Sequence, residues 1–215
     1  MRPYYSAARL FASGCLRILT GWDVRGREHV PPQGGVIVAS NHISFWDPPL
    51  IGAAAPRELH FLTREDLFGT PVVGMLIRSM NAIPIRRGVA DLTGMSRAMD
   101  RLKEGAALLM FPEGGRMQDG GSHPARPGVG MMAVNADVPI VPCCISGSDR
   151  QREWWTRGAR VRLWFGPARS WRELAGAGID HTPGRALYQQ VGDAVMREIA
   201  VLRTGQQTEA TRGAA

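Results

Sequence analysis

Short apolar runs alternate with helix-like segments along most of this chain, and this alternation constrains the fold more than any other feature. Residues 35–39, 106–111 and 138–145 have the length and apolar content of buried strands. Segments between them, such as 48–55 and 89–103, have the length and spacing of short helices. We therefore predict an α/β fold with a mixed, mostly parallel central sheet flanked by helices.

The rest of the chain supplies shorter elements of both kinds. We expect further strands at 22–26, 58–62, 82–85 and 160–165, and further helices at 64–80 with a break at 69–71, at 129–135 and at 183–203. Residues 114–128 are rich in glycine and proline and predict a loop. The 215 residues suffice for one domain with a substantial core, which we place at residues 21–203. Residues 204–215 are expected to form a disordered tail.

Residues 1–20 precede that domain and predict an amphipathic helix. Apolar side chains recur at helical spacing on one side, and arginines, including Arg9 and Arg17, recur on the other. Such a helix can lie in an anionic lipid interface, where its guanidinium groups meet phosphates. Packing on the domain's own core is an equally good interpretation. No apolar run reaches the roughly 20 residues needed to span a bilayer, so any membrane role is expected at the surface.

The charge of the chain predicts an anionic partner. Its formal charge is +7 and its pI is near 10.3. Nucleic acid, a phosphorylated substrate and an anionic membrane all fit, so charge alone does not choose among them. The aromatic residues do not alternate with arginines on any predicted strand, which speaks against a nucleic-acid-binding platform.

The cysteines and histidines indicate no metal or redox centre. Cys15, Cys143 and Cys144 have neither a disulfide framework nor metal-ligand spacing, and they suit a reducing, cytoplasmic compartment. The histidines other than His42 are scattered along the chain. Residues 128–133 match the glycine pattern of dinucleotide sites but follow no strand, so no nucleotide cofactor is predicted.

His42 and Asp47 stand where α/β folds place their chemistry. His42 lies just beyond the strand at 35–39, and Asp47 stands at the N-cap position of the next helix. The four residues between them let the chain turn back, so the Asp47 carboxylate can accept the imidazole N–H. The other ring nitrogen could then take a proton from a substrate hydroxyl. On spacing alone, an ordinary loop histidine beside a helix cap is the simpler interpretation.

Two arginines follow another predicted strand. Arg86 and Arg87 come directly after residues 82–85. Two guanidinium groups at a strand end can bind a phosphate through paired hydrogen bonds. A solvated basic turn would have the same sequence.

A glycine pair flanked by charges follows the strand at 106–111. Gly114 and Gly115 let the backbone approach a ligand closely, and Glu113 and Arg116 supply one charge of each sign. The alternative is a glycine turn with a surface ion pair, which contributes little energy.

Four blocks together resemble the glycerolipid acyltransferases, the lysophosphatidic acid (1-acylglycerol-3-phosphate) acyltransferase family. The blocks are Asn41-His42 to Asp47, Ala82-Ile83-Pro84-Ile85-Arg86-Arg87, Phe111-Pro112-Glu113-Gly114-Gly115-Arg116 and Val138-Pro139-Ile140-Val141-Pro142. They occur in the family's order. The resemblance implies transfer of a fatty acyl group from acyl-CoA or acyl carrier protein to the free hydroxyl of a lysophospholipid, in phospholipid biosynthesis at the cytoplasmic face of the membrane. It implies no metal or redox cofactor.

The resemblance also implies roles for individual residues. His42, oriented by Asp47, would deprotonate the hydroxyl for direct attack on the thioester. Arg87 would bind the acceptor's phosphate, and Arg86 and Arg126 are further candidates. The residues from Glu113 to Arg116, with Gly114 and Gly115, would hold the glycerol phosphate near His42.

The sequence departs from the usual family pattern in the second and third blocks. Asn81 stands where glycine is common, Arg86 where an acidic residue is frequent, Gly115 where threonine is typical and Met117 where serine is typical. Because these blocks read the acceptor, another lysolipid or amphipathic alcohol is an alternative substrate. A non-enzymatic, basic nucleic-acid-binding domain is the alternative from a different class. The fourth block, 138–142, could line a pocket or belong to the core.

Overall fold

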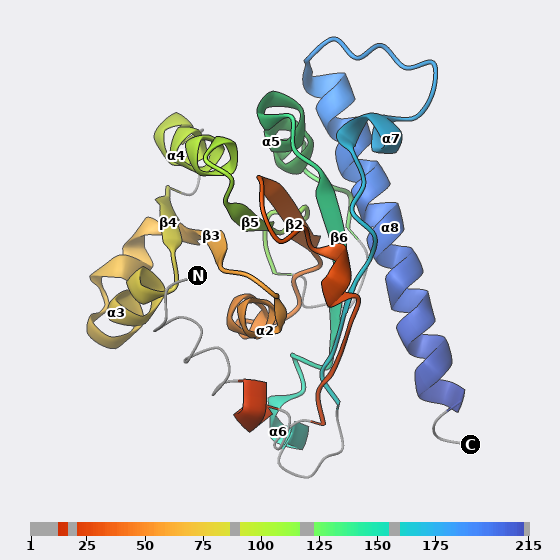
Figure 1. Cartoon of the computed structure of the whole chain (residues 1–215). Helices are drawn as coiled ribbons and strands as arrows, with labels where there is room; N and C mark the ends of the chain where they lie inside the picture. The colour runs from red at the N-terminus through yellow and green to blue at the C-terminus, as the bar shows by residue number, and fades with distance from the viewer. Residues whose placement is uncertain (1–12, 17–20, 87–90, 117–122, 155–159, 213–215) are drawn as a thin grey trace.

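The structure is a computed structural model, and it describes residues 13–16, 21–86, 91–116, 123–154 and 160–212 (Figure 1). Its centre is a seven-stranded sheet with the order β1-β7-β6-β2-β5-β3-β4. The strands are β1 (Asp23–Arg25), β2 (Val36–Ser40), β3 (Leu59–Arg64), β4 (Ala82–Ile85), β5 (Ala107–Met110), β6 (Ile140–Ser146) and β7 (Arg162–Phe165). All neighbouring strands pair in parallel except β6 and β7, which are antiparallel. The predicted mixed, mostly parallel sheet is therefore confirmed.

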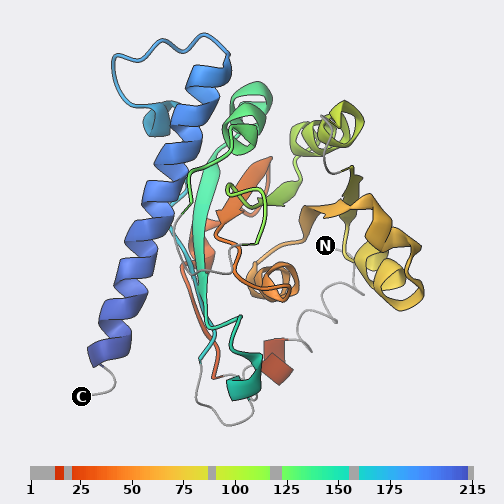
Figure 2. The same cartoon turned by 180° about the vertical axis from the view of Figure 1, so that it is seen from behind.

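Helices cover both faces of this sheet. They are α2 (Asp47–Ala54), α3 (Pro71–Ser79), α4 (Leu92–Lys103), α5 (Gly128–Ala136), α6 (Gln151–Trp154), α7 (Trp171–Ala175) and α8 (Arg185–Arg212), with 3-10 turns η1 (Arg27–His29) and η2 (Glu65–Gly69). Figure 1 shows α4 and α5 above the central strands, α2 below them and α8 running alongside β6, and Figure 2 shows the same arrangement from behind. The predicted break in the helix at 64–80 separates η2 from α3.

The sheet separates two apolar cores. One face of β2, with Ile37 and Ala39, packs with α4, α5, α7 and α8, while Val38 on the other face packs with α2. All five residues of β2 are buried, which explains why its sequence is a continuous apolar run without alternation. Cys143 and Cys144 contribute to opposite cores, as successive residues of a buried strand must.

The parallel strands bring several sequence blocks to one edge of the sheet. Because β2, β5 and β6 run in the same direction, the residues that follow them meet at what we call the C-terminal edge. His42 follows β2, Glu113 follows β5 and Ser148 follows β6. The opposite edge, where these strands begin, is called the N-terminal edge below.

The prediction of a disordered tail at 204–215 is wrong for the described part of that segment. Helix α8 continues to Arg212, beyond the residue at which sequence analysis ended it. The cause is Gln206, which is 2% exposed and lies against β6. Its amide donates to the carbonyl of Cys144 at 3.0 Å, and its carbonyl accepts from the Ser146 hydroxyl at 2.8 Å. A polar residue surrounded by tail-like sequence gave no signal of this anchor.

Most of the predicted N-terminal helix lies outside the described residues. Residues 13–16 are described, and they form a helical turn against α2. The Ser13 hydroxyl donates to the Ala53 carbonyl at 3.0 Å, and Leu16 packs against the core beside α2. This short part of the segment therefore contacts the domain's own core. None of the helices among the described residues has the length and apolar content needed to cross a membrane.

Two short helices were not predicted. Helix α6 has only four residues, too few for a periodic pattern. Helix α7 begins with a capping box, in which the Ser170 hydroxyl accepts from the Glu173 N–H and the Glu173 carboxylate accepts from the Ser170 N–H. The Ser-x-x-Glu spacing at 170–173 was therefore a usable signal.

Candidate functional site

His42 and Asp47 are in direct contact at the C-terminal edge. The His42 Nδ1 lies 2.9 Å from the Asp47 Oδ2, so the contact predicted from their spacing is present. The histidine side chain is 15% exposed and the aspartate side chain is fully buried. The imidazole stacks on the Phe111 ring with centroids 4.0 Å apart and an angle of 18° between the planes. The ring is therefore held by a hydrogen bond at one nitrogen and by a stacking contact on its face.

Asp47 does more than contact the imidazole. Its Oδ2 also accepts the backbone N–H groups of Ile43 at 2.7 Å and Ser44 at 2.8 Å, and its Oδ1 accepts the Ser148 hydroxyl at 2.5 Å. Four donors thus compensate a carboxylate that has lost all contact with water. Sequence analysis placed Asp47 at the helix N-cap, but Trp46 occupies that position and Asp47 is the first residue of α2. The carboxylate closes the preceding loop instead of capping the helix.

Asn41 fixes the start of the same loop to β6. Its side-chain amide donates to the Ile145 carbonyl at 2.9 Å, and its side-chain carbonyl accepts the Ile145 N–H at 2.9 Å. This pair continues the β2–β6 ladder by one side chain beyond the last paired residues. His42 therefore leaves the sheet from a fixed point.

Glu113 approaches the same loop from the end of β5. It is 4% exposed, and its Oε2 accepts the backbone N–H of His42 at 2.9 Å. Burial raises the pKa of Glu113, and the hydrogen bond from His42 and the nearby Arg203, His42 and His123 charges lower that pKa in part. The other oxygen, Oε1, is buried without a hydrogen-bond partner among the described residues. Glu113 thus supports the His42 backbone and forms no ion pair with Arg116 in the described structure.

Gly114 provides room for Arg126 beside Glu113. Its φ is +71°, and a Cβ there would lie 2.5 Å from Cδ and 2.7 Å from Nε of Arg126. The left-handed backbone conformation favours glycine here, and the Arg126 side chain lies directly against it. Gly115 has open space around it, and Arg116 is exposed. The structure thus brings Arg126 next to the third block.

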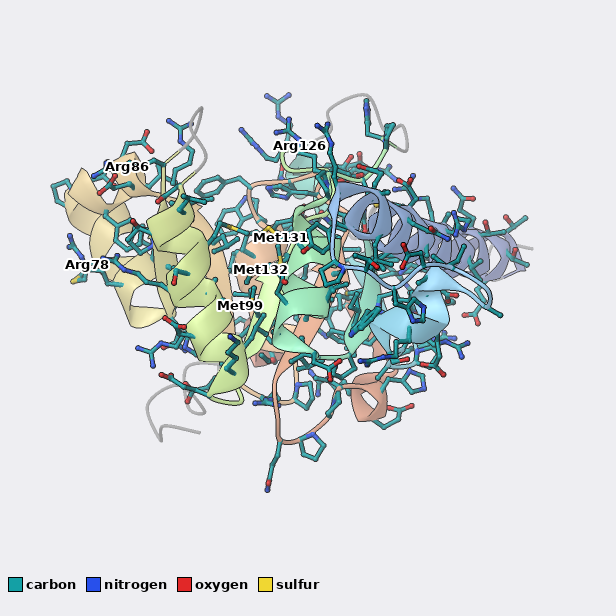
Figure 3. All side chains as sticks on the ribbon, turned by 90° about the horizontal axis from the view of Figure 1, so that it is seen from above. Arg78, Arg86, Met99, Arg126, Met131 and Met132 are labelled. Carbon is teal, nitrogen blue, oxygen red and sulfur yellow. The ribbon has the colours of Figure 1, made fainter. Side chains whose placement is uncertain are left out.

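The arginines after β4 lie apart from this group. Arg86 is exposed, and its Nε donates to Glu65 at 2.8 Å while its backbone N–H donates to Asp91. Figure 3 shows Arg86 beside α3 and Arg126 above α5, well apart in this view. Arg87 and Met117 lie outside the described residues.

The remaining departures from the family pattern have simple outcomes. Asn81 has a φ of +60°, a left-handed conformation that asparagine tolerates better than most residues. It therefore serves where glycine is common in the family. The fourth block is part of the core, because Ile140 and Val141 are fully buried.

Sequence analysis missed several residues that hold this site. Ser148 donates to Asp47, Gln151 donates to the Ser44 hydroxyl at 2.9 Å, and Trp154 packs edge-on against Trp46. All three missed residues lie in or near α6, which had no periodic pattern. Arg203 on α8, which is distant from the site in sequence, also lowers the pKa of Glu113 through its charge.

A hollow of about 930 Å³ opens at the N-terminal edge, not beside His42. It is lined by Arg27, Glu28, Val30, Pro32, Pro56, Arg57, Glu58, His60 and Ala106. These residues precede β2, β3 and β5 or, like His60, lie at the start of β3, whereas the His42 loop follows β2. The hollow therefore belongs to the other end of the sheet and contributes nothing to the His42–Asp47 contact.

Comparison with known proteins points to one family. The family model described as Acyltransferase matches residues 21–146, which include all four blocks. A 1-acyl-sn-glycerol-3-phosphate acyltransferase of Bacillus subtilis is 23% identical over 197 residues, which cover 89% of this chain and 95% of that protein. A chloroplastic 1-acyl-sn-glycerol-3-phosphate acyltransferase of Brassica napus is 29% identical over 150 residues, which cover 68% of this chain. This chain spans only 43% of that longer protein.

A solved structure has the same architecture. The crystal structure of the 1-acyl-sn-glycerophosphate acyltransferase PlsC of Thermotoga maritima superposes with a TM-score of 0.70 at 26% identity. The match covers 93% of this chain and 79% of that protein. The match therefore extends beyond the residues of the family model.

Proposed function

This chain belongs to the acyltransferase family, and we propose that it transfers a fatty acyl group from a thioester to the free hydroxyl of 1-acylglycerol-3-phosphate. The observation that carries the proposal is the 2.9 Å contact between His42 Nδ1 and Asp47 Oδ2 at the C-terminal edge. Relatives that are named for this reaction support the choice of acceptor. The product would be phosphatidic acid.

His42 acts as the general base in the proposed reaction. Its Nδ1–H donates to Asp47, which fixes the tautomer and leaves Nε2 as the acceptor of a proton. As the acceptor hydroxyl attacks the thioester carbonyl, its proton passes to Nε2. The tetrahedral intermediate then breaks its C–S bond, and the imidazolium returns the proton to the departing thiolate. General base catalysis of this kind contributes about 10²- to 10⁴-fold to a rate.

The proposed attack is direct, without an acyl-enzyme intermediate. The cysteines beside the loop are poor nucleophiles because burial raises the pKa of Cys143 well above its usual range and that of Cys144 to about 11. Ser148 is fully buried, and its hydroxyl donates to Asp47. The reaction consumes only a thioester and an alcohol, so we propose no metal or redox cofactor, with acyl-CoA or acyl carrier protein as the donor.

Cationic side chains at the same edge would bind the acceptor's phosphate. Arg126 covers Gly114 next to Glu113, and Arg116, two residues after Gly114, is exposed. We retain Arg87 as a further phosphate ligand by family resemblance, with Arg86 as the weaker candidate because it is paired with Glu65. Glu113 would act by holding the His42 backbone. Arginine suits this task because its planar donors bind phosphate oxygens in pairs.

The enzyme would work at the cytoplasmic face of an anionic membrane. Phe45 and Trp46 are 57% and 48% exposed, although both lie in the loop between His42 and Asp47. Aromatic side chains at the mouth of the site, together with a net charge of +7, suit a surface that delivers a lysophospholipid. This interpretation leaves no role for nucleic acid.

The decisive experiment offers the purified full-length chain a panel of acceptors and donors. The acceptors are 1-acylglycerol-3-phosphate, other lysophospholipids and monoacylglycerol in mixed micelles, each with acyl-CoA or acyl carrier protein, and products are identified by mass spectrometry. We expect phosphatidic acid to form fastest. If none of the acceptors received an acyl group, the proposal would be contradicted. Faster transfer to a different lysolipid would change the proposed acceptor to that lysolipid.

A further inference from the structure

Arg203 belongs to a part of the chain that neither the four sequence blocks nor the family match includes. It lies on α8, beyond residues 21–146. The helix is fixed at this point, because Gln206 sits three residues further on and bonds to Cys144 and Ser146 of β6. Residues three apart on a helix share a face. Arg203 therefore faces β6 near its C-terminal end.

The surroundings of Arg203 place it next to the His42 loop. Its hydrogen bond and charge lower the pKa of the Cys144 thiol, which burial raises. Its charge also lowers the pKa of Glu113, by less than the hydrogen bond from the His42 backbone does. Geometry points to the same place, because Gln206 bonds to Cys144 and Ser146 while Asn41, next to His42, bonds to Ile145 between them. Arg203 and the His42 loop therefore lie near the same segment of β6, although 161 positions separate Arg203 from His42 along the chain.

The charge of the Arg203 guanidinium group is not compensated by an ion pair within the described part of the chain. Among the described residues, no carboxylate lies within the 4.0 Å of an ion pair with it, whereas Arg25, Arg86, Arg150 and Arg172 each have such a partner. Arg203 is also half-buried, so water compensates its charge less completely than on the open surface. The neighbouring Glu113 keeps one buried oxygen without a hydrogen-bond partner among the same residues. Polar groups on both sides of this place therefore have bonding capacity that the fold does not use.

We propose that Arg203 binds the phosphate group of the acceptor lysophospholipid, as a specificity-determining residue supplied by the C-terminal helix. The inference rests on the proposed function and names one more residue of that same site. A phosphate seated there would lie beside the loop that carries His42, so that the glycerol hydroxyl can reach the imidazole. It would also be a suitable ligand for the planar donors of a guanidinium group. The anchor at Gln206 makes the position of these donors precise.

The test compares three variants of the full-length protein in steady-state kinetics. Arg203→Gln removes the charge, Arg203→Lys keeps the charge without the planar fork, and Arg197→Gln removes a charge from an exposed position on the same helix. A charge-assisted hydrogen bond to phosphate corresponds to about tenfold or more in binding. We expect Arg203→Gln to raise the KM for 1-acylglycerol-3-phosphate about tenfold with kcat changed less than about twofold. Arg203→Lys should lie between, and Arg197→Gln should match the unaltered protein.

A binding measurement separates this inference from the proposed function. Glycerol 3-phosphate, which carries the headgroup without an acyl chain, is titrated calorimetrically into each protein, and thermal melting confirms that each is folded. We expect its affinity to fall in Arg203→Gln by the same factor as the KM rises. Unchanged KM and affinity in Arg203→Gln, an equal loss in Arg197→Gln, or no binding by the unaltered protein would each overturn the inference. Acyl transfer by the unaltered protein in those cases would leave the proposed function standing.

Discussion

The two edges of the sheet contain arginines that are used in opposite ways. At the N-terminal edge, Arg57 donates to the backbone carbonyls of Pro31 at 3.0 Å, Gly34 at 2.9 Å and Gly105 at 2.6 Å. Its donors join three loops, and burial lowers its pKa. At the C-terminal edge, Arg203 and Arg126 have no carboxylate partner among the described residues.

This difference teaches how to locate the chemistry in this fold. The N-terminal edge has an open hollow of about 930 Å³, yet Arg57, which lines it, already donates its hydrogen bonds to the backbone. Among the described residues, bonding capacity remains unused at the C-terminal edge at the second nitrogen of His42, at one oxygen of Glu113 and at Arg203. A substrate can form hydrogen bonds with groups whose bonding capacity is unused, whereas an open volume alone offers it no partner. Four predictions can break or sharpen this contrast, in addition to the test of Arg203 given above.

Replacing His42 should have the largest effect on activity. We expect His42→Ala to lower kcat by about 10³-fold, because the proton of the acceptor hydroxyl would have no base. The ring is partly exposed and its main contacts are with Asp47 and Phe111, so the melting temperature should change by only a few degrees. Rates from mass-spectrometric assays and a thermal melt of the same preparation check both parts. A variant with full activity would remove the C-terminal edge from the mechanism.

Replacing Arg57 should have the opposite signature. We expect Arg57→Ala to lower the free energy of unfolding by about 2 kcal/mol, since three carbonyls lose a charged donor and the side chain is only partly buried. Both kcat and KM should remain unchanged in the folded fraction. Urea unfolding and steady-state kinetics test this, with the exposed Arg101→Ala on α4 as the matched control. A change in KM would show that the hollow at the N-terminal edge takes part in binding.

The fold was largely predictable because its strands are continuous apolar runs. The segments 35–39, 106–111 and 138–145 correspond to β2, β5 and β6, which form the buried centre of the sheet. What sequence analysis did not predict depends on single tertiary contacts. The end of α8 is held to the sheet by Gln206 on β6 and by Glu209, which pairs with Arg25 of β1. No local pattern distinguishes a glutamine that is 2% exposed from one in a tail.

The site was predictable to the extent that it is local in sequence. His42 and Asp47 are five positions apart, and the turn that joins them could be inferred from that spacing. Ser148, after β6, is 101 positions from Asp47, and Arg203, on α8, is 161 positions from His42. Only the completed fold brings such residues together. The bond between Glu113 and the His42 backbone, which joins residues 71 positions apart, was likewise not predicted.

Ser148 should have an intermediate effect that separates positioning from folding. Its hydroxyl is the donor to Asp47 Oδ1, and both groups are buried. We expect Ser148→Ala to lower kcat about tenfold with little change in KM, because a buried carboxylate oxygen left without its donor can shift away from His42. Ser170→Ala is the matched control, since it removes a serine hydroxyl from the α7 cap and should cost about 1 kcal/mol of stability without lowering kcat. An equal fall in kcat for both variants would show that Ser148 acts only on stability.

Glu113 should show the smallest effect, and it concerns pH. Because burial raises its pKa, the folded state holds the carboxyl proton more strongly than the unfolded chain does. The associated stability is complete below the ordinary pKa of a glutamate and is lost as pH rises through the raised value in the folded state. Glu113→Gln cannot ionise and keeps an oxygen that accepts the His42 N–H, so it should not lose that stability. Its free energy of unfolding, measured with urea, should therefore rise relative to the unaltered protein between acidic and neutral pH. Arg57 carries its charge throughout this range, so Arg57→Ala should show a difference independent of pH. A pH-independent difference for Glu113→Gln as well would mean that the C-terminal edge is wetter than its burial indicates.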